Sequence, residues 1–312
     1  GTKAPNSLGI YDMSGNVWEW CWDWYSSNYY SSSPQNNPTG PVTGTDRVRR
    51  GGFWQHSADY CRVSYRSYPM PPTHVGGVGF HVCRSTNRMV LVEGGTFNNG
   101  TSNVTLSSFY IDKYETTQAS YQAVMGANPS YFSGNPNRPV EQVSWFNAIE
   151  YCNRRSMQEG FTPCYSYLTY GTNPDNWPSG WNTEWQNHTN VSCVWTANGY
   201  RLPTEMEWMF AAKGGNQSQG YTYSGSNTIG NVAWYPGNSG YRTHDVGEKA
   251  FNEIGTFDMS GNVLEWCWDI LGTYVGENQN NPTGASSGNF RIARGGGYST
   301  SDYGCTVSIR LD

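Results

Sequence analysis

Charged residues are scarce in this sequence of 312 residues, at 14% of the total, and the formal net charge is −5. The lysines and arginines form no basic run. Binding to nucleic acid or to an anionic membrane depends on a basic patch, so the sequence argues against both partners. No apolar stretch approaches the roughly 20 residues that span a bilayer, and no signal peptide is recognisable. The sequence therefore predicts no transmembrane segment.

Closely spaced metal-binding residues are also absent. The eight cysteines include no C-x-x-C pair, which argues against a zinc-ribbon or thioredoxin-type site. Eight thiols in a chain of this length do not make a disulfide scaffold, so they leave the redox compartment open. The histidines lack the close spacing of a local non-haem iron or zinc motif; they are His56, His74, His81, His188 and His244.

Aromatic residues and glycine, in contrast, are abundant. Aromatic residues make up 15% of the chain, which contains 37 Gly, 14 Trp and 23 Tyr. This composition, rich also in Asn and Ser, is typical of a loop-rich fold with an aromatic surface, as many binding proteins have.

One string occurs twice. "GTKAPNSLGIYDMSGNVWEWCWD" begins at Gly1 and "GEKAFNEIGTFDMSGNVLEWCWD" begins at Gly247. Each copy continues through "NNPTG", an arginine before a glycine run, and a cysteine and an arginine further on. These last pairs are Cys61 with Arg66 and Cys305 with Arg310. The chain therefore contains one module and part of another.

The two copies differ in extent. The first continues through "GVGFHVCRS" to Ser85, whereas the second reaches Asp312 before the matching region, and residues 89–246 have no counterpart. We expect 1–88 to be a repeat of the C-terminal half, and 89–312 to be a module that lacks its last strand. The alternative is that 1–88 completes the same fold.

Local patterns predict short strands and few helices. "MVLVEGGTF" and "VTLSSFYI" alternate as strands do. Ser144 is placed to begin one helix, and Thr204 with Glu207 forms a capping box at the start of another. A further short helix ends at Gly126. The pattern favours an α+β fold with long loops.

Several blocks along nearly the whole chain share residue types with a known family: "MVLVEGGTF", "YETTQASYQAVMG", "PVEQVSWFNAIEYCN", "NGYRLPTEMEWMFAAKGG", "DMSGNVWEW", "RRGG" and "GFHVCRS". In type and order they resemble the formylglycine-generating-enzyme (sulfatase-modifying factor) branch of the C-type lectin fold, except that a terminal portion also appears first. The resemblance implies that fold class, α+β and loop-rich with short strands and few helices. The segment from "RVRRGGFW" to "GFHVCRS" resembles the variable regions of diversity-generating-retroelement proteins.

The resemblance also bears on catalysis. The oxidases of this family bind copper through a C-x4-C cysteine pair, because two thiolates hold a soft metal. Here Cys61 and Cys305 match the second position, but His56 and Thr300 occupy the first. We therefore expect no enzyme; a metal-dependent oxidase is the disfavoured alternative, and a structural accessory module is another.

The resemblance implies a possible calcium site in each copy of the "DMSGNV" turn. Hard oxygen ligands on a glycine-containing turn suit Ca²⁺. The alternative is that the acidic residues satisfy backbone groups while Trp18, Trp20 and Trp22 fill the core. The candidate ligands are Asp12, Gly15, Val17 and Glu19 in the first copy, and Asp258, Gly261, Val263 and Glu265 in the second.

The segment between Phe53 and His74 is the candidate ligand-binding surface. Its Tyr, Trp, Ser, Gln and Asp content is that of a binding loop, although an ordinary solvated loop can have a similar composition. The chain is thus expected to bind an unknown protein or other macromolecule, and the family resemblance implies a cell-surface or extracellular location. The candidate residues are Phe53, Trp54, Gln55, His56, Ser57, Asp59, Tyr60, Arg62, Ser64, Tyr65, Ser67, Tyr68 and His74.

Two structural expectations follow from this assignment. Side chains alternate along a strand, so a contact face requires some exposed positions while framework residues point inward. We expect Arg66 and Phe80 to be largely buried and a contiguous exposed patch to lie among Trp54, His56, Asp59, Tyr60, Tyr65 and Tyr68. In the resembled family the first and last strands are neighbours. We therefore expect the strand near Phe80 to lie beside the strand near Val92.

Overall fold

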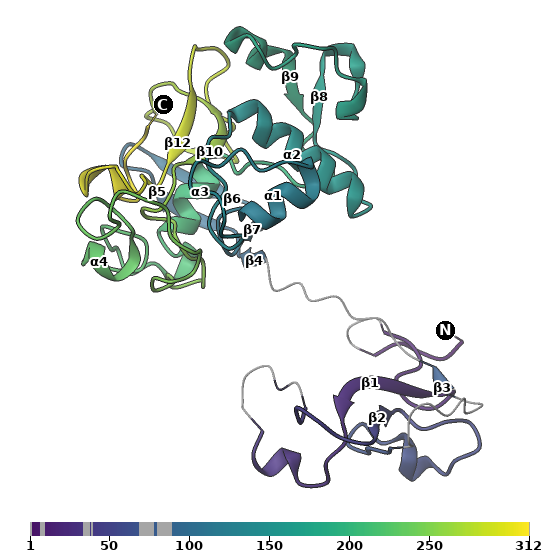
Figure 1. Ribbon diagram of the computed structural model, residues 1–312. Coiled ribbons are helices and arrows are strands. Elements are labelled where there is room, and N and C mark those ends of the chain that lie inside the picture. Colours follow the sequence, from purple (N-terminus) through teal and green to yellow (C-terminus); the bar gives the residue numbers. More distant parts are fainter. Residues whose placement is uncertain are drawn as a thin grey trace. The chain divides into compact units, whose positions relative to one another are not determined.

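The computed structural model describes residues 2–6, 10–33, 38, 40–68, 78–79 and 89–311. The chain divides into two compact units, Gly1–Ser85 (unit 1) and Thr86–Asp312 (unit 2). Figure 1 shows the short sheet of unit 1 and the helices and small sheets of unit 2.

Unit 1 is built on a three-stranded sheet in the order β2-β1-β3. Strand β1 (Trp18–Trp24) pairs antiparallel with β2 (Arg47–Arg50) and parallel with β3 (Val78–Gly79). Two short 3-10 helices lie in the connections, η1 (Tyr29–Ser31) and η2 (Ala58–Cys61). The sheet therefore brings the string "WEWCWDW", whose second copy reads "LEWCWDI", beside the arginines that precede the glycine turn.

Unit 2 distributes its strands over small sheets. Their orders in the described residues are β4-β7, β11-β6-β5, β8-β9 and β10-β12. Strand β10 is the counterpart of β1, and it pairs antiparallel with β12 as β1 does with β2. The strands are β4 (Met89–Val92), β5 (Gly95–Asn98), β6 (Asn103–Leu106), β7 (Phe109–Asp112), β8 (Tyr165–Tyr167), β9 (Val191–Cys193), β10 (Glu265–Ile270), β11 (Gln279–Asn280) and β12 (Arg291–Arg294).

The helices of unit 2 begin where the sequence predicts. Ser144 accepts a hydrogen bond from the N–H of Asn147 in a reciprocal capping box, and Thr204 does the same with Glu207. Gly126 ends the first helix with φ of 79°, a left-handed conformation that glycine adopts readily. The helices are α1 (Gln118–Met125), α2 (Trp145–Gln158), α3 (Glu205–Ala212) and α4 (Ile229–Val232), with 3-10 helices η3 (Leu168–Tyr170), η4 (Pro174–Asn176), η5 (Trp185–Asn190), η6 (Gly215–Gln217) and η7 (Tyr303–Cys305).

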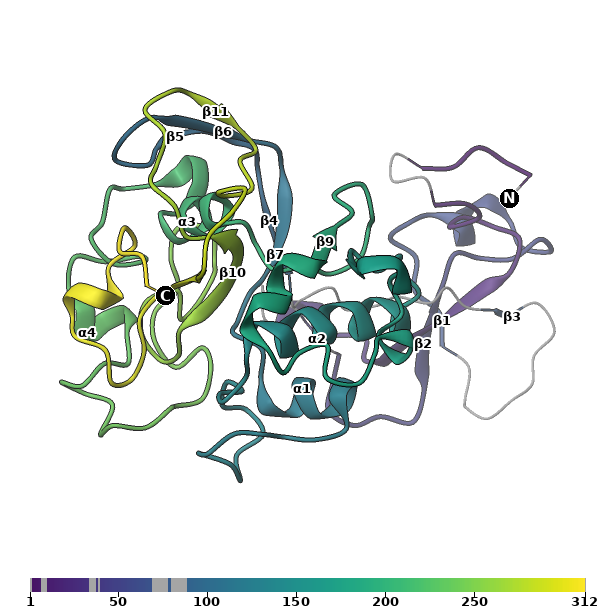
Figure 2. The ribbon, with the colours of Figure 1, turned by 90° about the horizontal axis from the view of Figure 1, so that it is seen from above.

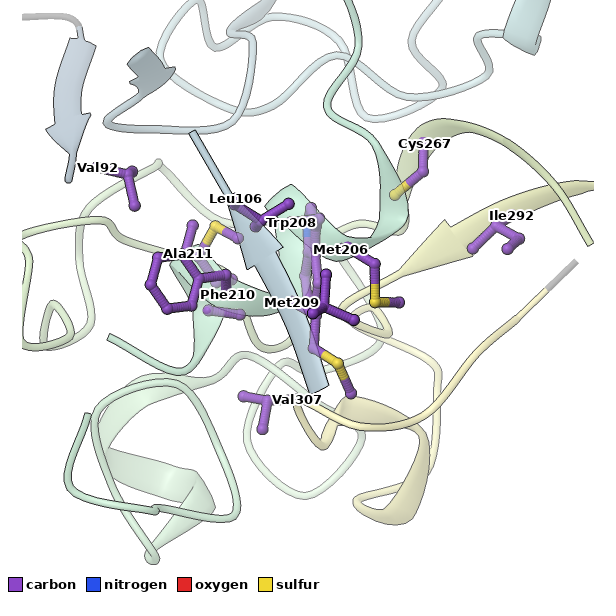
Figure 3. Packing of buried hydrophobic residues seen from close by; sticks show 13 residues of the cluster. Val92, Leu106, Met206, Trp208, Met209, Phe210, Ala211, Cys267, Ile292 and Val307 are labelled. Atoms are coloured by element: carbon purple, nitrogen blue, oxygen red, sulfur yellow. The ribbon is translucent and has the colours of Figure 1, made fainter. Parts of the chain in front are cut away.

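Two hydrophobic clusters form the core of unit 2. One surrounds α3, where Trp208 is fully buried among side chains from the flanking strands, including Ile292 (Figure 3). The other surrounds α2, centred on Trp145 and Ile149, and α1 lies alongside α2 in Figure 2. Burial of these large side chains is the main term that stabilises the unit.

The strand near Phe80 was expected to lie beside the strand near Val92, and the observed strand pairs bear on this expectation. Val78–Gly79 pairs with β1, and Met89–Val92 pairs with β7, so the described residues give no pairing between β3 and β4. Phe80 lies outside the described residues, and the expected contact between its strand and the strand near Val92 stays a prediction.

Candidate ligand-binding surface

A glycine turn at the end of β2 starts the candidate surface. Gly51 and Gly52 have φ of 91° and 72°. A Cβ on Gly52 would lie 2.8 Å from the Cys61 sulfur, so the turn requires glycine for space as well as for conformation. The chain leaves β2 here and folds back over the sheet.

The segment that follows, residues 53–68, is closed at its far end. The Arg49 N–H donates to the Ser67 carbonyl at 2.8 Å, and the Ser67 N–H donates to the Arg49 carbonyl at 3.0 Å. The Arg50 guanidinium donates to the carbonyls of Val63 and Tyr65, each at 3.0 Å. These bonds hold the segment, which we call the contact loop, against the strand that it leaves.

An aromatic layer supports the contact loop from below. Trp18, 1% exposed, lies beneath His56, Tyr60 and Tyr65, with ring centroids 5.5, 6.4 and 6.1 Å away. His56 also stacks on Tyr60 at 4.7 Å and meets Phe53 edge-on at 4.3 Å. We call these five residues the Trp18 cluster. The contact loop is therefore packed on the sheet through its own rings.

Other side chains of the contact loop face solvent. Trp54 is 71% exposed, Tyr68 51% and Tyr60 37%, while His56 and Tyr65 are half-buried. Phe53 and Ser67 are half-buried as well, and His74 lies outside the described residues. Short polar side chains surround the exposed rings; those exposed are Gln55, Ser57, Asp59, Arg62 and Ser64.

Arg66, which was expected to be largely buried, is partly covered by residues of its own unit. This side chain is half-buried, donates to the Ser26 carbonyl at 3.0 Å and lies over the Tyr30 ring at 4.1 Å. Its counterpart in unit 2, Arg310, donates instead to the carboxylate of Glu205 on α3 at 2.7 Å. The described residues of unit 1 include no helix equivalent to α3. Phe80, the other residue expected to be buried, lies outside the described residues.

Trp22 is an exposed aromatic side chain that the sequence reasoning missed. It is 80% exposed, with the Arg47 guanidinium 5.0 Å from its ring, although one interpretation placed it in the core. The equivalent Trp268 in unit 2 packs on Tyr165 at 5.3 Å and on Trp145 at 5.7 Å. Both partners come from residues 89–246, which have no counterpart in the first copy. A comparison of the two copies could therefore have indicated that Trp22 is exposed.

The cysteine positions do not form the pair that the oxidases use. Cys305 is buried, its thiol contacts the Thr300 carbonyl at 3.8 Å, and burial raises its pKa to about 11. Cys61 is half-buried beside the Trp18 cluster, in which His56 packs between rings. A protonated thiol without a second cysteine at this spacing lacks the soft donor pair that binds copper.

The two repeated turns have the same backbone. Asp12 and Asp258 have φ of 58° and 59°, and Asn16 and Asn262 have φ of 67° and 60°. Gly15 and Gly261 each donate from the backbone N–H to a carbonyl of the glycine turn, Gly51 or Gly295, at 2.7 and 2.8 Å. The turn thus connects the string that precedes β1 or β10 to the start of the contact loop or its counterpart.

The carboxylates near the second turn are buried. Asp258 accepts a hydrogen bond from the Gly247 N–H at 2.7 Å, and burial raises its pKa to about 6. Burial likewise raises the pKa of Glu265 to about 8. Glu115, not predicted from the sequence, accepts from the Val263 N–H at 3.0 Å, and burial raises its pKa well above the usual range.

The described part of the chain holds no group of three or more His, Cys, Asp and Glu side chains placed to bind a metal. A calcium ion at either turn would therefore depend on main-chain oxygens together with the carboxylates. Its binding stays a prediction for both turns.

The fold and the repeated motifs place the chain in a known family. A sulfatase-modifying factor enzyme 1-like domain profile matches residues 1–86 and again residues 82–311, so the chain belongs to this family. The fold is therefore the α+β, loop-rich C-type lectin fold of the formylglycine-generating-enzyme type. The sequence prediction of this fold is confirmed.

Individual relatives differ in what they do. The chain is 45% identical over 235 residues to the chaperone protein LppX of Paenibacillus barcinonensis, covering 68% of this chain and 79% of that protein. It is 47% identical over 79 residues to the formylglycine-generating enzyme of Streptomyces coelicolor, covering 24% of this chain and only 25% of that enzyme.

Solved structures show the same fold. Treponema denticola variable protein 1 superposes with a TM-score of 0.63 at 35% identity, covering 72% of this chain and 87% of that one. CarF superposes with a TM-score of 0.55 at 26% identity, covering 72% and 94%. Among the described residues, no helix has the length and apolar character needed to cross a membrane.

Proposed function

We propose that this chain is a non-enzymatic binding protein whose contact loop, residues 53–68, holds a protein or other macromolecular ligand. The observation that carries the proposal is the exposure of Trp54, Tyr60 and Tyr68 beside the half-buried rings of the loop. Large, rigid aromatic side chains among short polar ones are the composition of binding loops, because they provide contact area at little cost in side-chain entropy.

The closed shape of the contact loop supports the proposal. Its ends are joined by the Arg49 and Ser67 backbone bonds, and its centre rests on Trp18. A loop that is ordered before binding loses less conformational entropy when a ligand arrives. Trp54 and Tyr60 would supply the apolar contacts, and Asp59 the charged contacts around them.

The relatives support binding of a macromolecule. One is named a chaperone protein and another a variable protein, and the chain matches most of the length of each. We propose by this likeness that the ligand is a protein, that the contact loop belongs to the diversified type, and that the chain acts at the cell surface or outside the cell.

A thiol oxidase of the same fold is the competing function. The lone cysteine at each oxidase-like position, with Cys305 protonated, gives no support to copper chemistry. Incubation with copper and a cysteine-containing peptide, followed by mass spectrometry, separates the two functions. Conversion of the peptide cysteine to an aldehyde would contradict the proposal.

Peptides selected from a random displayed library on the full chain provide a ligand for direct measurement. Trp54→Ala, Tyr60→Ala and Tyr68→Ala should each weaken binding about 5- to 30-fold, because exposed aromatic anchors contribute roughly 1–2 kcal/mol. Tyr303→Ala, an exposed aromatic in the equivalent loop of unit 2, is the matched control and should leave the dissociation constant unchanged. Binding that survives all three loop substitutions places the contact surface elsewhere and refutes the proposal.

A further inference from the structure

His56 lies between rings of the Trp18 cluster. Its imidazole stacks on Tyr60 with the ring centroids 4.7 Å apart, and it meets Phe53 and Trp18 edge-on at 4.3 and 5.5 Å. Phe53 in turn contacts the exposed Trp54 edge-on at 6.2 Å. His56 thus connects the part of the contact loop that carries Trp54 with the part that carries Tyr60, and it joins both parts to the sheet.

One ring nitrogen of His56 is buried without a hydrogen-bond partner. This nitrogen is Nδ1, and no group in the described residues bonds to it. A neutral imidazole can leave Nδ1 without a hydrogen, whereas an imidazolium carries an N–H on both nitrogens. Gaining a proton would therefore create a buried N–H donor that has no acceptor in the present position of the ring.

No carboxylate forms an ion pair with His56 among the described residues. Asp59 on η2 pairs instead with Arg62 at 3.8 Å. Glu19 follows Trp18 on β1, so its side chain belongs to the opposite face of the strand, and Asp12 lies in the turn before β1. A charge on His56 would thus lack the counter-charge that a buried cation needs. The other titratable groups in or beside the Trp18 cluster are hydroxyls and a thiol, from Tyr60, Tyr65 and Cys61.

Two effects act in opposite directions on a protonated His56. The face of the Tyr60 ring would attract the imidazolium. Against this stand the N–H that has no acceptor and the Arg49 guanidinium, which lies 4.8 Å from the centre of the Trp18 ring. A single stacked ring recovers less free energy than the burial of a charged N–H without an acceptor costs. The Trp18 cluster as built therefore accommodates the uncharged imidazole.

The equivalent loop of unit 2 lacks this ring stack. Thr300 and Gly304 occupy the positions of His56 and Tyr60 in the repeat. A Cβ on Gly304 would lie 2.4 Å from the Cγ2 of Thr300, so two small residues pack closely where the contact loop has two rings. Of the two loops, only the contact loop is thus built around a titratable side chain.

We propose that His56 is a positioning residue of the contact loop, and that its uncharged imidazole holds the loop in the conformation that binds ligand. When His56 gains a proton, its ring leaves the Trp18 cluster, Trp54 and Tyr60 lose their common support, and the ligand is released. Histidine ordinarily changes its charge between about pH 5 and 8, so release accompanies mild acidification. The inference rests on the proposed function, because Trp54 and Tyr60 are the rings through which the loop holds its ligand.

The binding test uses the full chain and a histidine-free peptide, selected from a displayed library, whose binding Trp54→Ala weakens. We expect its dissociation constant to rise about tenfold from about pH 8 to about pH 5.5, because protonation creates the unpaired donor. His56→Phe keeps a ring but cannot be protonated, so its dissociation constant should change less than about twofold over the same range. His244→Gln, a substitution in unit 2, should keep the wild-type rise. An equal rise in the wild type and in His56→Phe overturns the inference.

Tryptic cleavage tests the loop without a ligand. In the closed loop the Arg62 carbonyl accepts from the Tyr65 N–H at 2.9 Å, and the Val63 carbonyl accepts from Arg50 at 3.0 Å. Cleavage after Arg62, measured by mass spectrometry, should be faster in the wild type relative to His56→Phe at about pH 6 than at about pH 8. A ratio that is the same at both pH values shows that His56 does not hold the loop. If no library peptide depends on Trp54, the proposed function fails, and this ratio still decides the role of His56.

Discussion

At the scale of single residues, Glu205 is the counter-charge of the buried Arg294 and of the half-buried Arg310. Its carboxylate accepts from Arg294 at 2.6 Å and from Arg310 at 2.7 and 2.9 Å, and Tyr274 donates to it at 2.9 Å. Arg294 is fully buried, so its guanidinium relies on protein partners alone.

We predict that Glu205→Gln lowers the free energy of unfolding by about 3–5 kcal/mol, because it leaves the buried Arg294 guanidinium without its counter-charge. Asp175→Asn is the control: Asp175 is largely exposed, and its pair with Arg154 should contribute at most about 1 kcal/mol. Urea denaturation followed by helical circular dichroism measures both. Equal losses for the two variants would show that Glu205 does not neutralise a buried cluster.

The buried carboxyl of Asp269 gives unit 2 a pH dependence. Burial raises its pKa from 3.8 to about 7, and its side chain accepts from the Glu205 N–H at 2.8 Å. Because the folded pKa is raised, this group stabilises fully below about pH 4, and its contribution is lost as the pH rises to about 7.

We therefore predict that Asp269→Asn reduces the fall in stability between these pH values, by up to about 1.4 kcal/mol per pH unit. The asparagine can still accept the Glu205 N–H, so the start of α3 is kept. Denaturation curves across this pH range measure the free energy of unfolding. If its pH dependence is the same in Asp269→Asn as in the wild type, the prediction is contradicted.

At the scale of elements, helix α3 begins where local chemistry places it. The Thr204 hydroxyl accepts from the Glu207 N–H, and the Glu207 carboxylate accepts from the Thr204 N–H at 2.8 Å. Arg201 donates two hydrogen bonds, of 2.6 and 2.7 Å, to the same carboxylate. The helix then buries Trp208 and Met209. The cap therefore positions the residues around which one core cluster of unit 2 forms.

Replacing the cap should destabilise the fold without changing it. Thr204→Ala is expected to cost about 1 kcal/mol, the usual value for a lost N-terminal cap, and Thr204→Ser should retain most of the stability because its hydroxyl still accepts. Thermal unfolding of the two variants provides the comparison. If serine is as destabilising as alanine, the threonine methyl group matters more than the hydrogen bond.

At the scale of the whole molecule, one string occurs in two environments. Trp268 packs on Tyr165 and Trp145, whereas Trp22 is 80% exposed at the equivalent position of unit 1. We predict that Trp268→Ala lowers stability by roughly 2–4 kcal/mol and that Trp22→Ala changes it by less than about 0.5 kcal/mol. Denaturation curves test the pair, and comparable losses would mean that Trp22 is covered in solution.

Calcium provides a further test on the whole chain. An ion at the Asp258 turn would offset the unfavourable burial of the Glu265 carboxylate, and a ligand of the native state stabilises by mass action. We expect a chelator to lower the melting temperature, added Ca²⁺ to restore it, and Mg²⁺ to be less effective. A melting temperature indifferent to all three would show that the turns are packing units only.

The sequence by itself determined the local features of the structure and the fold class. The capping residues Ser144 and Thr204 set the helix starts, and the turns at Asp12 and Asp258 adopt one backbone in both copies. The family motifs set the fold class. The helix caps depend on residues within a few positions of one another, and the motifs can be recognised directly in the sequence, so both can be predicted without the tertiary structure.

The exposure of the repeated side chains was decided only by the tertiary structure. Arg310 reaches Glu205 on α3, while its counterpart Arg66 lies over Tyr30. The same difference separates Trp268 from Trp22. The partners of the unit 2 residues come from the segment 89–246, which is distant in sequence and present once. Burial depends on which surfaces meet in space, so the equivalent tryptophans Trp268 and Trp22 are packed in one unit and exposed in the other.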